Sequence, residues 1–481
     1  MSLLADADAS TFWAHHSWPD FADFPNRDQT LVLLPTHGFS HYGGDLPLDL
    51  EEVLTSVVVR AAVGAAKEAM SVLVMPPLRF VLGAKKTAFL RIGAELASAL
   101  LREIAAGVQA AGFRKLVFVN SSAANADLID AVSRDIRAGL NLQTFIINTA
   151  GISLPFSAGS DLASLAAASF LTETTSLDNA RARLADSATQ LFGLLVEIHA
   201  RAPLGKSGRA PPIGLRTEIA LGRGEPFPEV YRERYLMGFS AARLTTWPAK
   251  EKTLIILPTG AIEQHGHHLP VGVDALLGQA ALRAALPRLP ANLPVLVAPP
   301  VTYGKSNEHV GFPGTIYISA DSLRKLLLSI AAELHEIGFR RIAIYNTHGG
   351  NTAVLNYTLR EIEETLGLEI TLLRPAYRPP ISSQEMHYGF HAGEWETALM
   401  LAATPELVKM ERATCEYPAQ IDDPGQLRPE NAPAIFSWIS RDLSVSGVMG
   451  DATAATLEKG RAWLDGLATS LAEAITVLAT R

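Results

Sequence analysis

The chain contains two copies of one sequence pattern. TLVLLPTHGFSHYGGDLPLD (residues 30–49) aligns with TLIILPTGAIEQHGHHLPVG (253–272) at an offset of 223, and IAAGVQAAGFRKLVFVN (104–120) aligns with IAAELHEIGFRRIAIYN (330–346) at an offset of 226. Segments that recur in the same order at a nearly constant offset indicate a duplicated domain rather than a solenoid of short units. We therefore predict two tandem domains, 1–225 and 226–481, joined near the Pro- and Gly-rich segment 202–214.

Each half has the pattern of an α/β domain. Leu31–Leu34 and Leu254–Leu257 are short apolar runs typical of buried strands. Ser322–Ile337 has apolar residues at helical spacing and stops at Gly338, and Ile342–Tyr345 follows as another buried strand. Because helices alternate with buried strands, we predict mostly parallel sheets.

Composition and charge exclude several classes of protein. Hydrophobic residues make up 48% and charged residues 19%, which is typical of a soluble globular chain, and the net charge of −8 argues against nucleic-acid binding. The single cysteine, Cys415, excludes an intrachain disulfide framework. The N-terminus lacks a basic region followed by an apolar run, and runs such as Leu254–Leu257 are too short to span a bilayer. We expect a cytoplasmic protein without a membrane partner.

The densest group of potential metal ligands lies in PTGAIEQHGHHLPVGVD (258–274), which contains Glu263, His265, His267, His268 and Asp274. The alternative, a polar loop with accidental histidines, is disfavoured because the whole chain has only 13 histidines. In an extended segment, Glu263 and His265 would lie on the same face. Nitrogen and oxygen ligands of this kind suit zinc, manganese or iron. The pattern predicts a divalent-metal site.

Two further motifs could reach the same site. NTHGGN (346–351) directly follows a predicted strand, where open α/β sheets build their sites, and it carries His348. HYGFHAGEWET (387–397) supplies His391, Glu394 and Glu396. The structural alternatives are a tight strand–helix turn for the first motif and, for the second, a helix start that favours acidic residues.

A fourth motif, YGKSNEHVGFPGT (303–315), carries Ser306, Glu308 and His309 on a loop flanked by glycines. Here the structural alternative is the stronger one. Glu308 and His309 would then only brace loops, and Ser306 would hydrogen-bond within its own turn.

Together these motifs, with GVMGDATAATLEKG (447–460), resemble the creatininase (creatinine amidohydrolase) family over nearly all of residues 245–465. The resemblance implies a three-layer α/β/α fold for each half, a two-metal centre and hydrolysis of C–N bonds in amides, mostly small or cyclic ones. It implies that the metal ligands are Glu263, His265, Asp274, His348 and Glu396, with Asp274 bridging both ions. It also implies that His391 is catalytic and that Ser306, Gly349 and Trp395 contact the substrate.

The chain departs from the family pattern at the histidine motif. Creatinine-cleaving members resemble one another in having Tyr and Glu where this chain has Gly349 and Gly350. That Glu is a metal ligand there, so in this chain its role would pass to Glu396 or another group. The change weakens creatinine as a candidate substrate. Members with the double glycine include formamide-cleaving enzymes and a peptidase-like branch.

The leading hypothesis is a metal-dependent amidohydrolase that acts on a small, cyclic amide or imide. Two divalent ions per chain, zinc, manganese or iron, would lower the pKa of a shared water and polarise the amide carbonyl. His391, titrating near neutral pH, would pass a proton to the leaving nitrogen. The alternatives are a deformylase or peptidase-like hydrolase of a linear amide, and a non-catalytic binding or scaffold protein. We also expect a homo-oligomer.

The N-terminal copy has lost the residues that the resemblance assigns to the site. The six counterparts, in the order Glu263, His265, Asp274, His348, His391 and Glu396, are Ser40, Tyr42, Glu51, Ser122, Ser157 and Leu162. Such a set does not build a two-metal shell. We predict that this half binds no catalytic metal and that it replaces an oligomeric partner or covers the active site of its twin.

Overall fold

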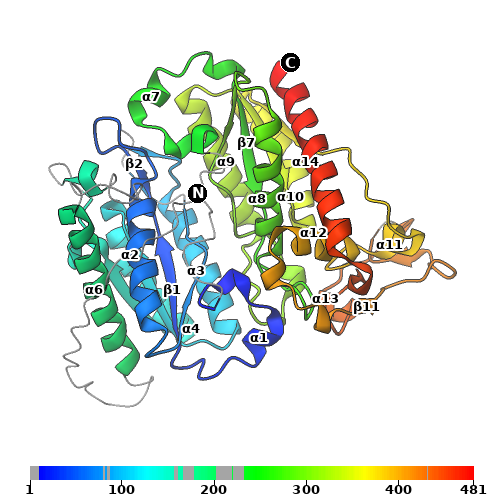
Figure 1. Ribbon diagram of the computed structural model, residues 1–481, viewed down its shortest axis with the longest axis horizontal. Helices are drawn as coiled ribbons and strands as arrows, with labels where there is room; N and C mark the ends of the chain where they lie inside the picture. The colour runs from blue at the N-terminus through cyan, green and yellow to red at the C-terminus, as the bar shows by residue number, and fades with distance from the viewer. Residues whose placement is uncertain are drawn as a thin grey trace.

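The computed structural model describes residues 10–79, 82–83, 87–156, 161–165, 178–201, 219, 232–430 and 432–481. The predicted domain boundary at 225, the segment 202–214 and Ser157 lie outside the described residues. The described part forms two halves that lie side by side, one from the first half of the sequence and one from the second (Figure 1).

The N-terminal half is built on a four-stranded parallel sheet in the order β3-β1-β5-β6. Its strands are β1 (Leu31–Thr36), β3 (Val72–Val74), β5 (Lys115–Asn120) and β6 (Gln143–Asn148). Every residue of the first three is buried, which explains their continuous apolar sequence. The helices are α1 (Trp18–Ala22), α2 (Leu50–Ala66), α3 (Ala94–Ala110), α4 (Ala126–Leu140) and α6 (Asp178–Ala200).

The C-terminal half has a second parallel sheet in the order β10-β9-β7-β8. Its strands are β7 (Leu254–Thr259), β8 (Val295–Val297), β9 (Arg341–Asn346) and β10 (Glu369–Leu372). The helices are α7 (Ala241–Thr245), α8 (Val273–Ala285), α9 (Ala320–Ile337), α10 (Thr352–Leu366), α11 (Ser383–Tyr388), α12 (Glu394–Ala403), α13 (Ser440–Leu443) and α14 (Leu457–Thr480). As predicted, α9 ends at Gly338, which caps it with a φ of 113°.

The two sheets repeat the same topology in the same register. Leu31 of β1 pairs with Val72 and Lys115, and Leu254 of β7 pairs with Val295 and Arg341. These pairs stand at the same offsets as the sequence repeats.

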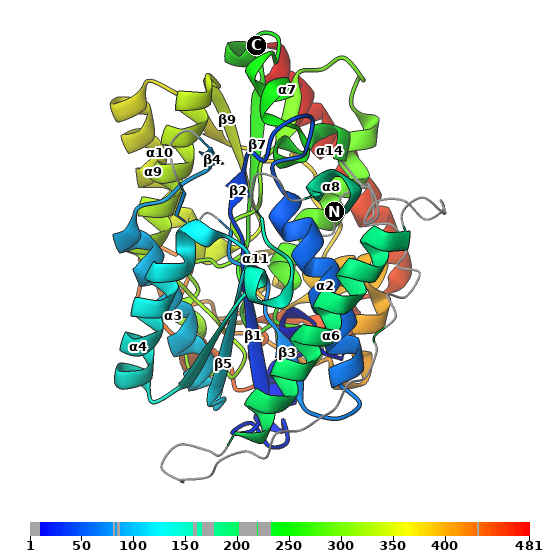
Figure 2. The ribbon, with the colours of Figure 1, turned by 90° about the vertical axis from the view of Figure 1, so that its left-hand side faces the viewer.

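Helices cover both faces of each sheet, so each half has three layers (Figure 2). In the N-terminal half α2 packs against α6 on one face, and α3 packs against α4 on the other. In the C-terminal half α9 and α10 cover one face, and α8, α12 and α14 cover the other. The predicted α/β fold with mostly parallel sheets is confirmed.

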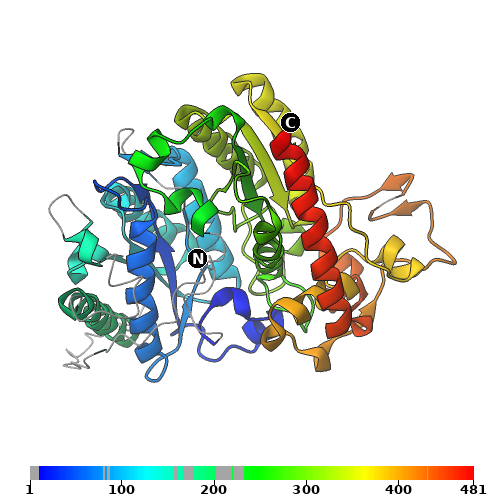
Figure 3. The same ribbon diagram turned by 45° about the horizontal axis from the view of Figure 1, so that its top comes forward.

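Three two-stranded sheets extend this framework. They pair β2 (Phe39–Ser40) with β4 (Ala88–Phe89), β11 (Cys415–Glu416) with β14 (Gly450–Asp451), and β12 (Leu427–Arg428) with β13 (Ala434–Ile435). The segment with β12 and β13 extends away from the body of the C-terminal half (Figure 3).

By length and composition α14 could cross a membrane, and it is the one such helix among the described residues. In the structure it packs along α8 and α12 and buries Trp463, Leu467, Leu471 and Ile475. This packing is that of a core helix.

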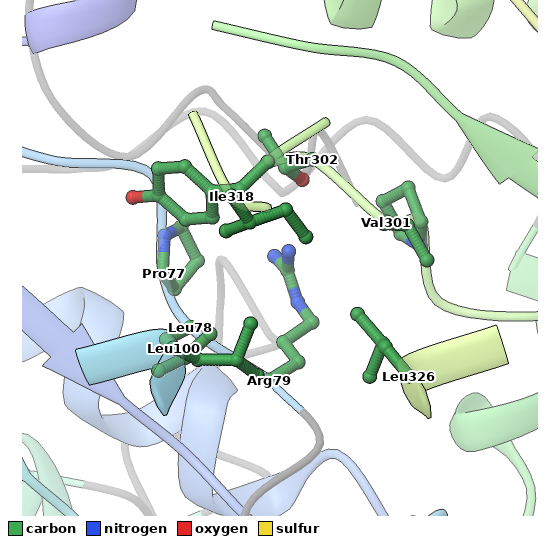
Figure 4. Close-up of a pocket in the computed structure, with 10 residues that line it drawn as sticks. Pro77, Leu78, Arg79, Leu100, Val301, Thr302, Ile318 and Leu326 are labelled. Carbon is green, nitrogen blue, oxygen red and sulfur yellow. The ribbon is translucent and has the colours of Figure 1, made fainter. Parts of the chain in front are cut away.

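Equivalent residues of the two repeats meet where the halves touch. Leu78 and Leu100 of the N-terminal half face Val301 and Leu326 of the C-terminal half around the side chain of Arg79 (Figure 4). Nearby, α3 packs against α9. The halves therefore contact each other as a pseudo-dimer.

A segment at the start of the N-terminal half is hydrogen-bonded to the metal-ligand motif of the other half. Val271 N donates to His16 O at 2.8 Å, and Gly272 N donates to Ala14 O at 3.0 Å. Both donors lie just before Asp274, the second residue of α8. Residues 14–16 therefore hold the chain that leads into a predicted metal ligand.

The same segment is attached at a second place. Trp18 Nε1 donates to Ser446 O at 3.1 Å, and Asp20 forms an ion pair with Lys409 at 2.5 Å. The N-terminal half thus supplies part of the support for its twin's site.

Gly272→Ala is expected to lower the free energy of unfolding by about 1–3 kcal/mol, the usual cost of overpacking. A Cβ there would lie 2.6 Å from Ala14 O and 2.8 Å from Ala14 Cβ. Gly93→Ala is the matched control, because Gly93 also caps a helix N-terminus but has no neighbour within 4 Å of a new Cβ. Denaturant unfolding of both variants measures the difference. If both variants lost the same free energy of unfolding, the close contact between Gly272 and Ala14 would not contribute to stability.

Candidate active site

The predicted ligands gather at the carboxyl ends of β7 and β9. Glu263 and His265 follow β7, His348 follows β9, Asp274 lies in the first turn of α8, and Glu396 lies in the first turn of α12. Parallel strands place their carboxyl ends at one edge of a sheet, and this explains why residues so distant in sequence meet there.

The carboxylates and imidazoles lie within contact of one another. His265 Nε2 is 3.5 Å from Asp274 Oδ1, 3.8 Å from Glu396 Oε2 and 3.9 Å from Glu263 Oε1. His348 Nδ1 is 3.2 Å from Glu263 Oε2 and 3.3 Å from Asp274 Oδ2. Asp274 thus directs one oxygen to each histidine, as a bridging ligand would. The structure brings all five predicted ligands together.

Three histidines share one arrangement of their ring nitrogens. One nitrogen lies close to a backbone carbonyl: His265 Nδ1 at 3.0 Å from Glu263 O, His348 Nε2 at 3.0 Å from Lys305 O, and His391 Nε2 at 2.8 Å from Gln264 O. Because a carbonyl only accepts, these nitrogens carry the proton. The other nitrogen of each ring faces the carboxylates. Against the effect of burial, Asp274 and Glu396 raise the pKa of His265 to about 9, so a bound cation would take the place of the proton on that nitrogen. This is the arrangement of metal-ligating histidines.

Several atoms at the centre lack hydrogen bonds. Glu263 Oε2, His265 Nε2 and Asp274 Oδ2 are buried and make none. Since nearly all buried polar atoms in proteins are paired, three such atoms on residues of one ligand cluster fit a bound cation. Electrostatics agree, because burial and Asp274 raise the pKa of Glu263 to about 7. Carboxylates, imidazoles and unpaired atoms together fit a divalent metal centre.

Other histidines and acids of the motifs point elsewhere. His268 Nε2 is hydrogen-bonded to Thr397 Oγ1 at 2.8 Å, and His267 packs against the ring of Trp18. Glu394 forms an ion pair with Lys459 at 2.5 Å. Of the three imidazoles in the first motif, His265 is therefore the one that joins the cluster.

Gln264, which no sequence motif marks as a site residue, forms a buried network with His309 of the fourth motif. Gln264 Oε1 accepts from Gly266 N at 2.8 Å, and its Nε2 donates to Gly447 O at 3.0 Å and to His309 Nδ1 at 2.9 Å. The proton of His309 must then sit on Nε2, which lies 3.4 Å from Glu263 Oε1. Unlike the other three rings, His309 presents an N–H to the site.

His391 lies between the rings of His265 and His309, with centroid distances of 4.3 and 4.4 Å. Its Nδ1 is 3.7 Å from Glu263 Oε1. Burial and the positive charge of His265 hold the pKa of His391 well below its usual value. This differs from the expectation of a group that titrates near neutral pH, and it leaves His391 as a neutral base.

The segment that carries His391 and leads into Glu396 in the first turn of α12 is held in place by hydrogen bonds to Glu385. Glu385 accepts from Glu394 N at 2.8 Å and from Asp451 N at 2.9 Å. Ala392, which follows His391, has a left-handed φ of 54°, and its N–H donates to Glu396 Oε2 at 2.6 Å. Strained backbone of this kind persists only where the surroundings hold it in place.

The cluster opens into a cavity of ≈ 800 Å³. Its inner wall is polar and contains Glu263, Asp274 and His391, and its outer wall is formed by residues 435–439. Gly349 lines it, as predicted for a substrate-contacting residue, but Ser306 and Trp395 are not among the described residues that do. Ser306 is fully buried, and Trp395 stacks on Trp463 at 5.7 Å.

The equivalent place in the N-terminal half is closed by hydrogen bonds. The Glu51 carboxylate accepts from Gly38 N at 3.0 Å, Tyr42 OH at 2.5 Å and Ser121 Oγ at 3.0 Å. Among the described residues, every group of side chains that could hold a metal lies in the C-terminal half. The loss of the metal site from the first copy stays a prediction.

The creatininase model, described as creatinine amidohydrolase, matches residues 14–191 and 240–475, a pattern that fits a tandem arrangement. The chain is 34% identical to the mycofactocin precursor peptide peptidase of Mycobacterium ulcerans (strain Agy99) over 224 residues, which are 45% of this chain and 80% of the relative. It is 31% identical to the creatinine amidohydrolase of Pseudomonas putida over 244 residues, 46% of this chain and 88% of that protein.

Among solved structures, a mutant creatininase has a TM-score of 0.43 and 26% identity, and the match covers 52% of this chain and 99% of that one. The family model covers most of the chain in two regions, and the relatives are matched over most of their own lengths. The chain therefore belongs to the creatininase (creatinine amidohydrolase) family of hydrolases.

Proposed function

We propose that the C-terminal half hydrolyses the C–N bond of a linear, peptide-like amide with divalent metal ions held by Glu263, His265, Asp274, His348 and Glu396. The observation that carries the proposal is the common orientation of His265 and His348. Each ring donates one N–H to a backbone carbonyl and turns its other nitrogen toward buried carboxylate oxygens.

The size of the cavity favours a linear substrate over a small ring. Its volume of ≈ 800 Å³ lies near the upper end of ligand cavities. Phe436 and Ile439 on its outer wall suit an apolar side chain that extends from the scissile bond. A relative named as a peptide peptidase supports this choice. A small cyclic amide is the second candidate, supported by the relative named creatinine amidohydrolase.

The chain's own residues supply positioning and proton transfer. When bound, the metal ions would provide a water of lowered pKa and polarise the scissile carbonyl. His309 Nε2–H can donate a hydrogen bond toward the substrate at the inner end of the cavity. His391 Nδ1 can take the proton of the attacking water and deliver it to the leaving nitrogen.

Chelation is expected to abolish hydrolysis, and addition of zinc or manganese to the chelated full-length protein is expected to restore it. The assay measures amine released from blocked dipeptides and from cyclic amides and imides of similar chemistry. Hydrolysis that survives complete chelation would contradict the metal-dependent reaction. If only the cyclic compounds were hydrolysed, the proposed substrate would be a small cyclic amide and not a linear one.

A further inference from the structure

Glu308 enters the ligand cluster from the loop that follows β8. It lies in the 3-10 helix η9 (Asn307–His309), its side chain is 11% exposed, and its Oε1 is 3.5 Å from His348 Nε2. Ligand atoms of Glu263, Glu308 and His348 all lie within 4.8 Å of one another. This spacing allows one cation to contact all three.

The space that Glu308 occupies is left open by Gly350. A Cβ on residue 350 would lie 1.9 Å from Glu308 Oε1, 2.5 Å from His348 Nε2 and 2.7 Å from Lys305 O. Gly350 is not among the glycines with positive φ, so its backbone does not require glycine. The neighbouring Gly349 would meet nothing within 4 Å. Glycine is required at 350 because a carboxylate approaches there.

Glu308 is not needed to orient the His348 ring, which is what a carboxylate behind a metal-ligating histidine usually does. The proton on His348 Nε2 is taken by Lys305 O at 3.0 Å, so that ring is oriented without Glu308. Lys305 Nζ binds Glu308 Oε2 at 2.8 Å, which fixes the carboxylate and leaves Oε1 beside His348, 3.5 Å from its Nε2. An oxygen held in this way is suited to ligate a cation.

We propose that Glu308 is a further metal ligand, which completes with Glu263 and His348 the shell of one ion in the space opened by Gly350. The inference rests on the proposed function, because it assumes that the cluster binds divalent ions. The inference makes Glu308 a metal ligand, whereas the sequence pattern favoured a purely structural role for it in its loop.

The test is the affinity of the full-length protein for Mn²⁺ and Zn²⁺, measured by competition with a metal-sensitive chelator and without a substrate. Glu308→Gln is expected to weaken the affinity for one ion by more than about 100-fold, because loss of an outer-shell partner costs only about 10- to 100-fold. Glu430→Gln, an exposed carboxylate at the same cavity, is the matched control and should leave affinity unchanged.

A loss of about 100-fold or less in Glu308→Gln would overturn the inference. Wild-type protein that binds no ion would instead contradict the proposed function, so the two failures are distinguishable. If Glu308→Gln does not fold, the pair Gly350→Ala and Gly349→Ala decides. The first displaces the Glu308 carboxylate and should lose the ion, and the second should retain it. Equal affinities in that pair would overturn the inference.

Discussion

Asp274→Asn is expected to release both metal ions and to lower hydrolysis by at least about 1,000-fold, because bound ions supply several kcal/mol of transition-state stabilisation. Asp274 is buried, with Oδ1 3.5 Å from His265 Nε2 and Oδ2 3.3 Å from His348 Nδ1. Like Glu263, it faces the ring nitrogens of both histidines, and of the two carboxylates it lies closer to His265 Nε2, at 3.5 Å against 3.9 Å. An amide would keep the shape of the side chain but lose its charge, so both shells would weaken together.

Asp321→Asn is the matched control for this change. Asp321 is the second residue of α9, just as Asp274 is the second residue of α8, but its side chain is exposed on the helix surface. The control variant should bind both ions and keep wild-type turnover. Metal content by elemental analysis and amide hydrolysis should be measured on the same samples. If Asp274→Asn retained two ions, the bridging assignment would be wrong.

The architecture could be predicted from the sequence because the repeat determines it. Two aligned segments imply two equivalent sheets, and the helix that ends at Gly338 followed by β9 implies parallel strands. Glu263 and His265 were also predictable, since both follow a buried strand in a segment that is dense in ligands. Sequence patterns therefore predict site residues well where the ligands directly follow a recognisable strand in the same short segment.

Contacts made across long distances in sequence could not be predicted in this way. Glu308 and His309 have the pattern of a loop brace, and only the fold brings their loop against Glu263 and His348. Gln264 could not be recognised from the sequence, because a glutamine between a glutamate and a histidine is not itself a typical metal ligand. In the structure its side-chain amide fixes the tautomer of His309. Strand and helix patterns do not specify which loops meet at the sheet edge.

The family resemblance was a weaker guide to substrate contacts than to ligands. Ser306 has no exposure, Trp395 packs on Trp463, and neither is among the described residues that line the cavity. Contacts to a substrate depend on the outer wall, which here comes from residues 435–439 in a segment without a recognised motif. The hydrogen bonds from Val271 and Gly272 to His16 and Ala14 could not be predicted either. Their acceptors are backbone carbonyls, which every residue has.

His391→Ala is expected to retain both metal ions and to lower turnover by about 100- to 10,000-fold, the usual contribution of a general acid–base group. Its Nε2–H is bound to Gln264 O at 2.8 Å, so Nδ1 is the nitrogen that is free to take a proton in the cavity. Because burial and His265 hold its pKa well below the usual value, the ring is neutral in the free protein and has a vacant position for that proton. An alanine would leave the leaving nitrogen without a proton donor.

His387→Ala provides the comparison, since His387 is an exposed histidine four residues earlier in the same segment. That variant should match the wild type in metal content and in turnover. Two other results for His391→Ala would each change its assignment. Loss of an ion would make His391 a metal ligand, which its position within 4.8 Å of His265 and Glu396 permits. Full turnover with both ions bound would remove it from the reaction and leave His309, the other ring with an N–H toward Glu263, as the proton donor to examine next.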